Sequence, residues 1–365
     1  MLGSGLAWTY AGRVGHDGGS SGPRPAPPAM ARLHPVAPRR PSQGRVGAVP
    51  PFRKASSANE EHVACASRCP RAADSEDAPA VAIPEIDPQE LVIKDEIVEM
   101  GCSGQVETFM GEWEGQQVIV KKLVQFGKLN VRKKVEFTRE ISLLATLSHP
   151  NLIKLLGVAL STVPPHMVLE HCAGGSLYEI LHNRFDVPLA WWQIVQMSQD
   201  IAETMAYLHS KWCIHRDLTS LNLMLQQALT NQNDIPVVKV CGLCSARVTD
   251  LSEGWANMTK DVGTLVWSAP EILSRLPTYN EKVDIYSFAM ILFEMTCRQP
   301  PFEDMDTIEI VKTVCAGGRP SLESLPLECP PTLRALIIAS WVGNPSERHS
   351  FARICSILGD LRATL

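Results

Sequence analysis

The chain has 365 residues, its formal net charge is -5, and 45% of its residues are hydrophobic. That hydrophobic fraction is enough for a sizeable core and excludes a disordered or fibrous protein. Residues 1–58 carry eight Lys or Arg and a single acid, so the remainder is acidic, and nucleic-acid binding by the folded part is not expected.

Residues 1–88 are rich in Gly, Pro, Ala, Ser and Arg and show no sustained helical or strand periodicity. We expect a disordered basic tail that passes into an acidic linker. Residues 1–58 also resemble an organelle transit peptide, because they are rich in Arg and poor in acids. The prolines at 23, 25, 27, 28, 35 and 38 suit an amphipathic targeting helix poorly and favour a solvated tail.

Eleven cysteines without repeated spacing, and no hydrophobic region near the start that resembles a signal peptide, indicate reduced thiols. This predicts a cytoplasmic protein, or an organelle protein if residues 1–58 are a transit peptide. The longest nearly apolar run, residues 285–295, is too short to span a bilayer and is predicted to be a buried core helix. No membrane span is therefore expected.

From Leu91 onward, short apolar runs alternate with glycines. We predict strands over residues 91–98, 106–110, 117–123, 152–158 and 166–170. A helix with the apolar stripe Phe137, Ile141, Leu144 and Leu147 separates the third strand from the fourth. Further helices are predicted over residues 191–209, 283–295, 308–316, 331–341 and 351–361. A strand-rich amino half before a helix-rich carboxyl half is an α+β arrangement in two lobes, about residues 89–171 and 172–363.

Residues 214–222 read IHRDLTSLN and fit the pattern H-R-D-L-x-x-x-N, in which the Asp takes a proton from a substrate hydroxyl and the Asn holds a metal ion. Further motifs occur around it in order: VIVK at 118–121, Phe137-x-x-Glu140, HPN at 149–151, GT-x-x-WSAPE at 263–271, DIYSF at 284–288, and Trp341 followed by P-x-x-R at 345–348. On these motifs residues 90–363 resemble a protein kinase domain, nearest the tyrosine-kinase-like group of serine/threonine kinases. The resemblance implies the two-lobed protein kinase fold, ATP and Mg as cofactors, and a protein partner or protein substrate. It leaves a kinase-domain dimer open.

Phosphoryl transfer requires a protein mainly to place the reactants and to neutralise charge on the phosphates. The resemblance implies that Lys121 contacts the α- and β-phosphates and that Glu140 holds its ammonium group. It implies that Asp217 is the proton acceptor and that Asn222 binds magnesium. The residues that it places around the nucleotide are Val98, Gly101, Gly104, Val106, Lys121, Leu169 and Met224. The structural alternatives are an ordinary ion pair at Lys121 and Glu140, and an Asp217 carboxylate bonded within its own loop.

Two further roles follow from the resemblance. Glu271 and Arg348 would form a buried ion pair that anchors the activation segment in the larger lobe. Arg216 would hold a phosphorylated residue of that segment by charge-assisted hydrogen bonds, with Thr249, Ser252 and Thr259 as candidates. A plain solvated loop is the alternative interpretation of these three hydroxyls.

Three departures from the family pattern lie on the nucleotide side. Glu99 stands at the first glycine of the Gly-rich loop, where its carboxylate would face the triphosphate. Ile119 replaces the alanine that touches adenine, and overpacking of this kind costs about 1–3 kcal/mol. Thr219 replaces a common lysine, which is a mild change. Together these substitutions predict weakened nucleotide binding.

The fourth departure is Gly242, which stands where the family has the aspartate that chelates magnesium between the β- and γ-phosphates. Glycine has no side-chain oxygen for this task. Removing one preorganised electrostatic group typically costs about 10²–10³ in rate, and a lost metal-binding carboxylate should cost at least as much. The nearest acid upstream, Asp234, is predicted to lie in a polar turn and not to substitute.

The same region contains a C-x-x-C, formed by Cys241 and Cys244. A redox pair or a zinc site would need a thioredoxin-like context or two more ligands. Neither context is present, so a redox pair is not favoured, and the nearby Cys172 and Cys213 are just as well explained as small buried side chains.

The sequence therefore predicts a two-lobed protein kinase fold behind a disordered basic tail. We expect a pseudokinase, a protein that keeps the kinase shape, regulates or scaffolds a partner, and transfers phosphate weakly or not at all. The alternative is an active serine/threonine kinase that uses Asp217, Lys121, Glu140 and Asn222 with ATP and magnesium.

Overall fold

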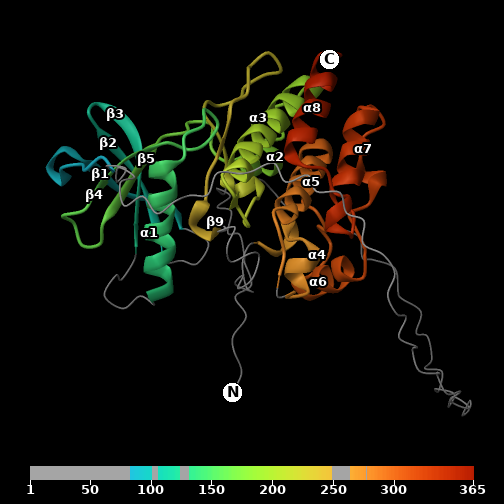
Figure 1. Ribbon diagram of the computed structural model, residues 1–365. Helices are drawn as coiled ribbons and strands as arrows, with labels where there is room; N and C mark the ends of the chain where they lie inside the picture. The colour runs from blue at the N-terminus through green and yellow to red at the C-terminus, as the bar shows by residue number, and fades with distance from the viewer. Residues whose placement is uncertain (1–82, 101–105, 124–130, 249–263, 277) are drawn as a thin grey trace, which may run out of the picture. The chain divides into compact units, whose positions relative to one another are not determined.

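The computed structural model describes residues 83–365 except 101–105, 124–130, 249–263 and 277. Strands dominate the first part of this chain and helices the second (Figure 1). This arrangement confirms the predicted α+β fold in two lobes.

One five-stranded antiparallel sheet, in the order β1-β2-β3-β5-β4, forms most of the amino-terminal lobe. Its strands are β1 (Val92–Met100), β2 (Val106–Trp113), β3 (Gln116–Leu123), β4 (Leu155–Ala159) and β5 (His166–Glu170), and α1 (Val131–Thr146) lies between β3 and β4 in the chain. Because side chains alternate between the faces of a strand, Val118 and Val120 enter a small core with Phe109. Ile119 lies on the opposite face, which packs against the main core. Lys121 shares this second face, since it lies two residues beyond Ile119.

Residues 84–86 add an edge pairing to this sheet. Glu85 pairs in parallel with Val158 on β4, and Ile86 is buried in the small core. A Cβ atom on Gly157 would lie 2.7 Å from Cγ1 of Ile86, so the close approach of the two segments requires glycine. Composition places these residues in the linker that was expected to end at residue 88, but Ile83, Ile86 and two backbone hydrogen bonds with Val158 join them to the fold.

The carboxyl-terminal lobe is built on helices with a few short strands. Its helices are α2 (Leu177–His182), α3 (Trp191–Ser210), α4 (Pro270–Leu273), α5 (Lys282–Cys297), α6 (Thr307–Cys315), α7 (Pro331–Ser340) and α8 (Phe351–Arg362). Its strands are β6 (Cys213–Ile214), β7 (Leu223–Leu225), β8 (Val238–Val240) and β9 (Arg247–Val248), paired as β6 with β9 and β7 with β8. Short 3-10 turns lie at η3 (Ser220–Asn222), η4 (Leu243–Ser245) and η5 (Leu265–Trp267).

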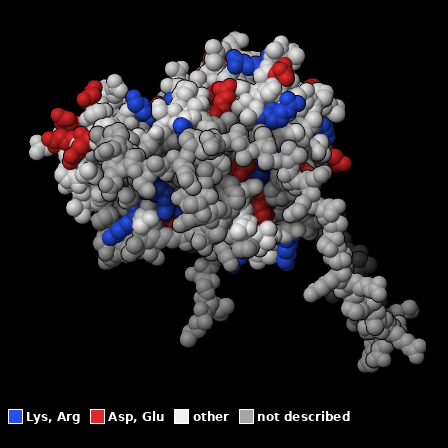
Figure 2. All heavy atoms as spheres, in the orientation of Figure 1, with Lys and Arg blue, Asp and Glu red and all other residues white. Residues whose placement is uncertain are grey.

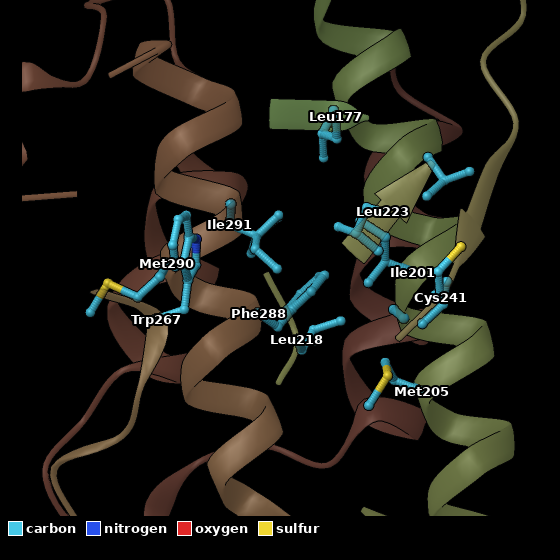
Figure 3. Packing of buried hydrophobic residues seen from close by; sticks show 14 of the residues in the cluster. Leu177, Ile201, Met205, Leu218, Leu223, Cys241, Trp267, Phe288, Met290 and Ile291 are labelled. Atoms are coloured by element: carbon cyan, nitrogen blue, oxygen red, sulfur yellow. The ribbon is translucent and has the colours of Figure 1, made fainter. Parts of the chain in front are cut away.

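Helix α5 is mostly apolar and is buried along almost its whole length, as predicted. Figure 3 shows Leu218 beside Phe288, between α5 and the α3 residues Ile201 and Met205. The loop that carries Asp217 is therefore fixed to the central core through the residue that follows it.

The predicted strand over residues 152–158 is shorter in the structure. Strand β4 begins at Leu155, whereas Leu152 forms a parallel bridge with Val240 of β8. The backbone also bonds from Ile153 N to Val240 O and from Val240 N to Asn151 O. Apolar runs do not reveal which partner strand they join, so the boundary could not be placed from the pattern.

The described surface is acidic at one end of the sheet, where Figure 2 shows red side chains over β1 and β2. Glu90, Glu112 and Glu114 are exposed, and Glu112 on β2 pairs with Val92 on β1. An acidic face repels nucleic acid. In the described part of the chain, no helix is long and apolar enough to cross a bilayer.

Candidate active site

Asp284, at the start of α5, fixes the backbone of the loop over residues 214–222. Its buried carboxylate accepts hydrogen bonds from the backbone N of His215 and of Arg216, both at 2.9 Å, and from Nε2 of His209 at 2.8 Å. Burial alone would raise the pKa of Asp284, but the hydrogen bond and charge of His209 hold the pKa below its ordinary value. An ionised carboxylate therefore fixes the backbone on which Asp217 stands.

Asp217 itself is buried, with its two carboxylate oxygens in separate contacts. Oδ1 accepts a hydrogen bond from Thr264 N at 3.0 Å, and Oδ2 accepts one from Asn222 Nδ2 at 3.3 Å. Burial raises the pKa of Asp217, although the nearby His215 and these hydrogen bonds oppose the increase. The side chain therefore ties Thr264 to the 214–222 loop, and its role as a proton acceptor stays a prediction.

Lys121 on β3 and Glu140 on α1 face each other, with 3.9 Å between Nζ and Oε1. Glu140 is buried and Lys121 is partly exposed. Helix α1 packs against η4, whose first residue, Leu243, is fully buried. The predicted ion pair is thus formed, at a long separation, and α1 is docked beside Gly242.

The residues proposed for the base of a nucleotide come from both lobes. Ile119 on β3 pairs with the buried Leu169 on β5. Val106 on β2 and Met224 on β7 are partly buried, and all four side chains belong to or pack against the same core cluster. Apolar side chains of this kind suit contact with a flat base, and Ile119 is larger than the alanine of the family pattern.

Gly242 has φ +79° and ψ 42°, a left-handed conformation that glycine adopts without strain. A Cβ atom built on it would lie 2.6 Å from Oδ1 and 2.7 Å from Cγ of Asn222. The Asn222 amide donates from Nδ2 to the backbone O of Asp217 at 2.8 Å. The amide of Asn222 therefore occupies the space into which a side chain at residue 242 would extend.

These residues do not fit a magnesium ion. Mg²⁺ requires near-octahedral oxygen ligands and usually at least one carboxylate. Asn222 offers one amide oxygen, and Gly242 offers no side chain. Asp234 accepts hydrogen bonds from Thr230 and Asn231 within its own exposed turn, as expected, and does not replace the missing group.

Of the two C-x-x-C thiols, Cys241 is buried and Cys244 half-buried, and neither is activated by ionisation. Burial raises the pKa of Cys244 to about 12 and that of Cys241 well above its ordinary value. A thiol attacks or binds metal as the thiolate, so neither side chain is activated at neutral pH. Among the described residues, no three His, Cys, Asp or Glu side chains are grouped as metal ligands.

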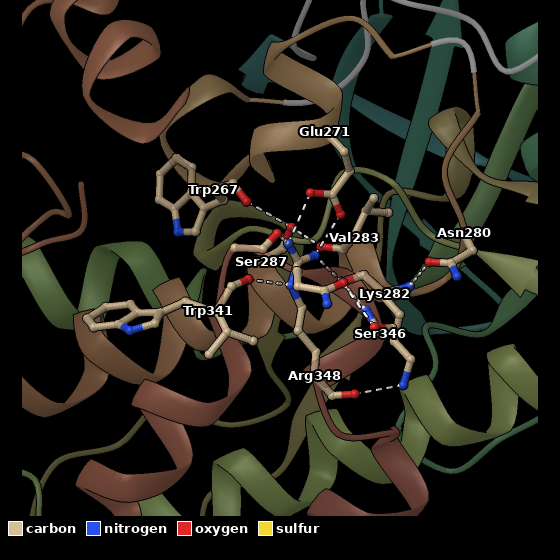
Figure 4. A network of polar contacts seen from close by, with 12 residues as sticks. Trp267, Glu271, Asn280, Lys282, Val283, Ser287, Trp341, Ser346 and Arg348 are labelled. Atoms are coloured by element: carbon tan, nitrogen blue, oxygen red, sulfur yellow. Dashed lines mark hydrogen bonds and ion pairs between the residues drawn. The ribbon is translucent and has the colours of Figure 1, made fainter. Parts of the chain in front are cut away.

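The predicted ion pair between Glu271 and Arg348 is confirmed. Nη1 and Nη2 of Arg348 lie 2.6 Å and 3.0 Å from the two carboxylate oxygens of Glu271 (Figure 4). The guanidinium also donates to the backbone O of Val342 and of Lys282, both at 2.9 Å. The pair joins α4 to the segment before α8, and both side chains are buried.

The buried carboxylate of Glu294 on α5 was not assigned a role from the sequence. It accepts hydrogen bonds from Ser220 at 2.7 Å, from Trp267 Nε1 at 2.9 Å and from His182 Nε2 at 2.7 Å. It thereby joins the 214–222 loop, η5 and α2. A charge inside an otherwise apolar helix is the signal that could have revealed it, because a buried charge needs partners.

The guanidinium groups of Arg139, Arg216 and Arg247 lie close enough for their charges to interact, and Arg216 belongs to the 214–222 loop. Burial, followed by the charges of Arg216 and Arg139, lowers the pKa of Arg247 to about 10. Arg216 lies over the ring of Tyr279, 5.7 Å from its centroid. The cluster is electropositive and suits a doubly charged anion.

Several predicted residues lie outside the described part of the chain. They are Gly101, Gly104, Thr249, Ser252, Thr259, and the side chains of Val98 and Glu99.

A sheet and a helix that bring a lysine and a glutamate next to a loop with an aspartate and an asparagine make up a protein kinase domain. Residues 92–358 match the family described as protein tyrosine and serine/threonine kinase, so the chain belongs to the protein kinase family.

Similar proteins support this assignment. A probable serine/threonine-protein kinase of Dictyostelium discoideum is 32% identical over 280 residues, which cover 76% of this chain and 28% of that protein. The serine/threonine-protein kinase VIK of Arabidopsis thaliana is 32% identical over 283 residues, covering 77% of this chain and 63% of VIK. The dual specificity protein kinase pyk3 of D. discoideum is 31% identical over 270 residues, covering 73% of this chain and 18% of pyk3. The matched region thus spans less than two thirds of the length of each relative.

Proposed function

We propose that the protein is a pseudokinase of the tyrosine-kinase-like group, a kinase-fold signalling protein that scaffolds or regulates a protein partner and transfers phosphate weakly or not at all. The observation that carries the proposal is the relationship between Gly242 and Asn222. At Gly242 the carboxylate of the family pattern is missing, and the Asn222 amide occupies the space beside it.

The size of the effect follows from the chemistry. In phosphoryl transfer, metal ions bridge the β- and γ-phosphates and neutralise developing charge, and the protein does little covalent chemistry of its own. With the metal-binding carboxylate lost, we expect a rate reduced by at least about 10²–10³. Lys121 would be left as the principal positive group near the phosphates, and its pair with Glu140 is compatible with a purely structural role.

Nucleotide binding, in this proposal, is weak. The apolar lining of Val106, Ile119, Leu169 and Met224 suits a base, and Ile119 narrows it. Val98, Gly101 and Gly104 would complete the site. Without a cation to screen the triphosphate, binding would be independent of magnesium.

The retained contacts favour a scaffold with a fixed conformation. Thr264 is bonded to Asp217, and Trp267 and Ser220 are bonded to Glu294. These bonds join η5 to the 214–222 loop through protein groups alone. A kinase fold stabilised in this way can present one surface to a partner without turnover.

The second candidate is an active serine/threonine protein kinase that uses ATP. It is favoured by the retained arrangement of Lys121, Glu140 and Asp217, and by relatives whose names describe serine/threonine kinases. Slow turnover with one metal ion at Asn222 would be its mechanism.

Incorporation of radiolabelled phosphate from ATP separates the two candidates. The full chain is assayed for autophosphorylation and for transfer to a generic protein substrate, beside Asp217→Asn, which keeps the shape of the side chain. The proposal predicts incorporation at or only slightly above the level of Asp217→Asn. Incorporation that is abolished by Asp217→Asn would show an active kinase.

A further inference from the structure

Charged side chains of both signs surround the place where the phosphates of a nucleotide would lie. Lys121 supplies a positive charge, and Glu140 supplies a negative one, with 3.9 Å between Nζ and Oε1. Asp217 adds a second negative charge beside Asn222. When all three groups are ionised, the two acids outweigh the lysine, and phosphate groups meet net repulsion from them.

The thiol of Cys244, two residues beyond Gly242, shows the sign of the electrostatic field at this place. Burial raises its pKa most, the charges of Glu140 and Asp217 raise it further, and the charge of Lys121 lowers it. Each of the two acids has a larger effect at this thiol than the lysine has. A negative field of this kind disfavours every additional phosphate charge.

An active kinase offsets such repulsion with magnesium, which the residues of this site do not fit. Metal ions bridge the β- and γ-phosphates and neutralise their charge. In this chain Oδ1 of Asn222 lies 2.6 Å from the Cβ position of Gly242, and the two residues together offer one amide oxygen and no carboxylate. The charge of a triphosphate is then left to Lys121, which Glu140 already partly neutralises.

The residues proposed for the base carry no charge. Val106, Ile119, Leu169 and Met224 belong to or pack against one core cluster, and Ile119 pairs with Leu169 between β3 and β5. Contact between apolar side chains and a flat base does not depend on the charge that the rest of the ligand carries. These residues therefore suit the uncharged part of a nucleotide.

We infer that the candidate active site binds an uncharged nucleoside in preference to ATP, and that each added phosphate weakens binding. The base lies against the apolar side chains, and no metal ion takes part. A nucleoside has no phosphate to transfer, so it acts as a regulatory ligand that stabilises the fold. This deepens the proposed pseudokinase function by naming the class of ligand, and it rests on that function.

Isothermal titration calorimetry of the full chain with adenosine, AMP, ADP and ATP, in EDTA and at equal ionic strength, tests the order of affinities. We expect adenosine to bind most tightly and ATP about tenfold more weakly, since the nearby net charge is negative. Magnesium in place of EDTA should not bring ATP to the affinity of adenosine. ATP that binds as tightly as adenosine in either buffer would overturn the inference, and so would a failure of adenosine to bind.

Charge variants test whether the order has this electrostatic cause. Asp217→Asn and Glu140→Gln each remove one negative charge and should raise the affinity for ATP relative to that for adenosine. Lys121→Met removes the positive charge and should lower the same ratio. Glu328→Gln, at an exposed position in the loop before α7, is the matched control and should leave the ratio unchanged.

Melting curves show which of these variants fold, and the ratio is compared among those that do. A ratio that stays at the wild-type value in the folded site variants would overturn the electrostatic explanation and the inference with it.

The phosphate-incorporation assay separates this inference from the proposed function. Incorporation that Asp217→Asn abolishes would contradict the pseudokinase, whatever the order of affinities. Tight binding of ATP without incorporation would contradict the preference for a nucleoside and leave the pseudokinase in place.

Discussion

The amide of Asn222 lies where the side chain of residue 242 would begin, with Oδ1 2.6 Å from the Cβ position of Gly242. Asn222 and the missing acid would be the two protein ligands of one metal ion in an active kinase. In this chain the Asn222 side chain lies against Gly242 and donates a hydrogen bond from Nδ2 to the backbone O of Asp217. Asp217, Asn222 and Thr264 are thus bonded to one another at the centre of the candidate active site.

Restoring an acid at residue 242 should create a cation site at a cost. Gly242→Asp must adopt φ +79°, which Asp tolerates better than most residues, and must displace the Asn222 amide. We expect the free energy of unfolding to fall by about 1–2 kcal/mol without metal. Magnesium should then raise the melting temperature of Gly242→Asp.

Gly242→Asn is the matched control, since it has the same shape and backbone tolerance without the charge. It should show the same loss of stability and no response to magnesium. If Gly242→Asp and Gly242→Asn respond to magnesium alike, the missing carboxylate is not what prevents metal binding.

Breaking the ion pair of Glu271 and Arg348 should destabilise the carboxyl-terminal lobe strongly. Glu271→Gln leaves the buried guanidinium without its counter-charge, and we expect a loss of about 3–5 kcal/mol in urea unfolding. Replacing both residues by Met should cost less than Glu271→Gln alone, because no charge is then left buried. Asp186→Asn, which breaks an exposed pair with Arg184, should leave the unfolding midpoint unchanged.

Asp200 on α3 should make stability depend on pH. Burial raises its pKa from 3.8 to about 6, although hydrogen bonds from the backbone N of Val238 and from Gln196 oppose the increase. The folded state then holds its proton more tightly than the unfolded chain does. The stabilisation from this group is full below the ordinary pKa and is lost as the pH rises to about 6.

The effect is at most about 3 kcal/mol. Urea unfolding of wild type and Asp200→Asn at about pH 4.5 and about pH 7 measures it. The wild type should lose stability relative to Asp200→Asn over this interval. If the wild type instead gains stability relative to Asp200→Asn over this interval, folding lowers the pKa of this carboxyl and the interpretation is wrong.

The guanidinium cluster of Arg216, Arg139 and Arg247 should bind a divalent anion. Each positive charge lowers the cost of bringing in a sulfate or phosphate group, whether free or on a phosphorylated side chain. Sulfate should raise the melting temperature more than chloride at equal ionic strength. Arg247→Gln should reduce this increase, and Arg184→Gln, a change of an exposed arginine, should not.

The sequence was most informative where residues must meet a single chemical requirement. The apolar character of α5 predicted its burial, and the Glu271–Arg348 pair followed from the motifs that carry the two residues. The ends of β3 and β5 also lie within one residue of the prediction. In each case, local pattern and family resemblance agree.

The sequence was least informative where a side chain has several possible hydrogen-bond partners. Nothing in the order of residues says that Asn222 turns toward Gly242, that Thr264 bonds to Asp217, or that Glu294 collects Trp267 and Ser220. These contacts join segments far apart in the chain and depend on tertiary packing. The burial of Ile86 was not predicted either, because the short segment around it shows no sustained period.

The most direct test of the central claim is a titration of the wild-type protein with ATP, with and without magnesium, followed by the melting temperature. The account predicts that magnesium adds nothing to any stabilisation that ATP produces, because Asn222 and Gly242 do not make a cation site. A stabilisation by ATP that appears or grows only with magnesium, and that Asn222→Ala removes, would contradict it.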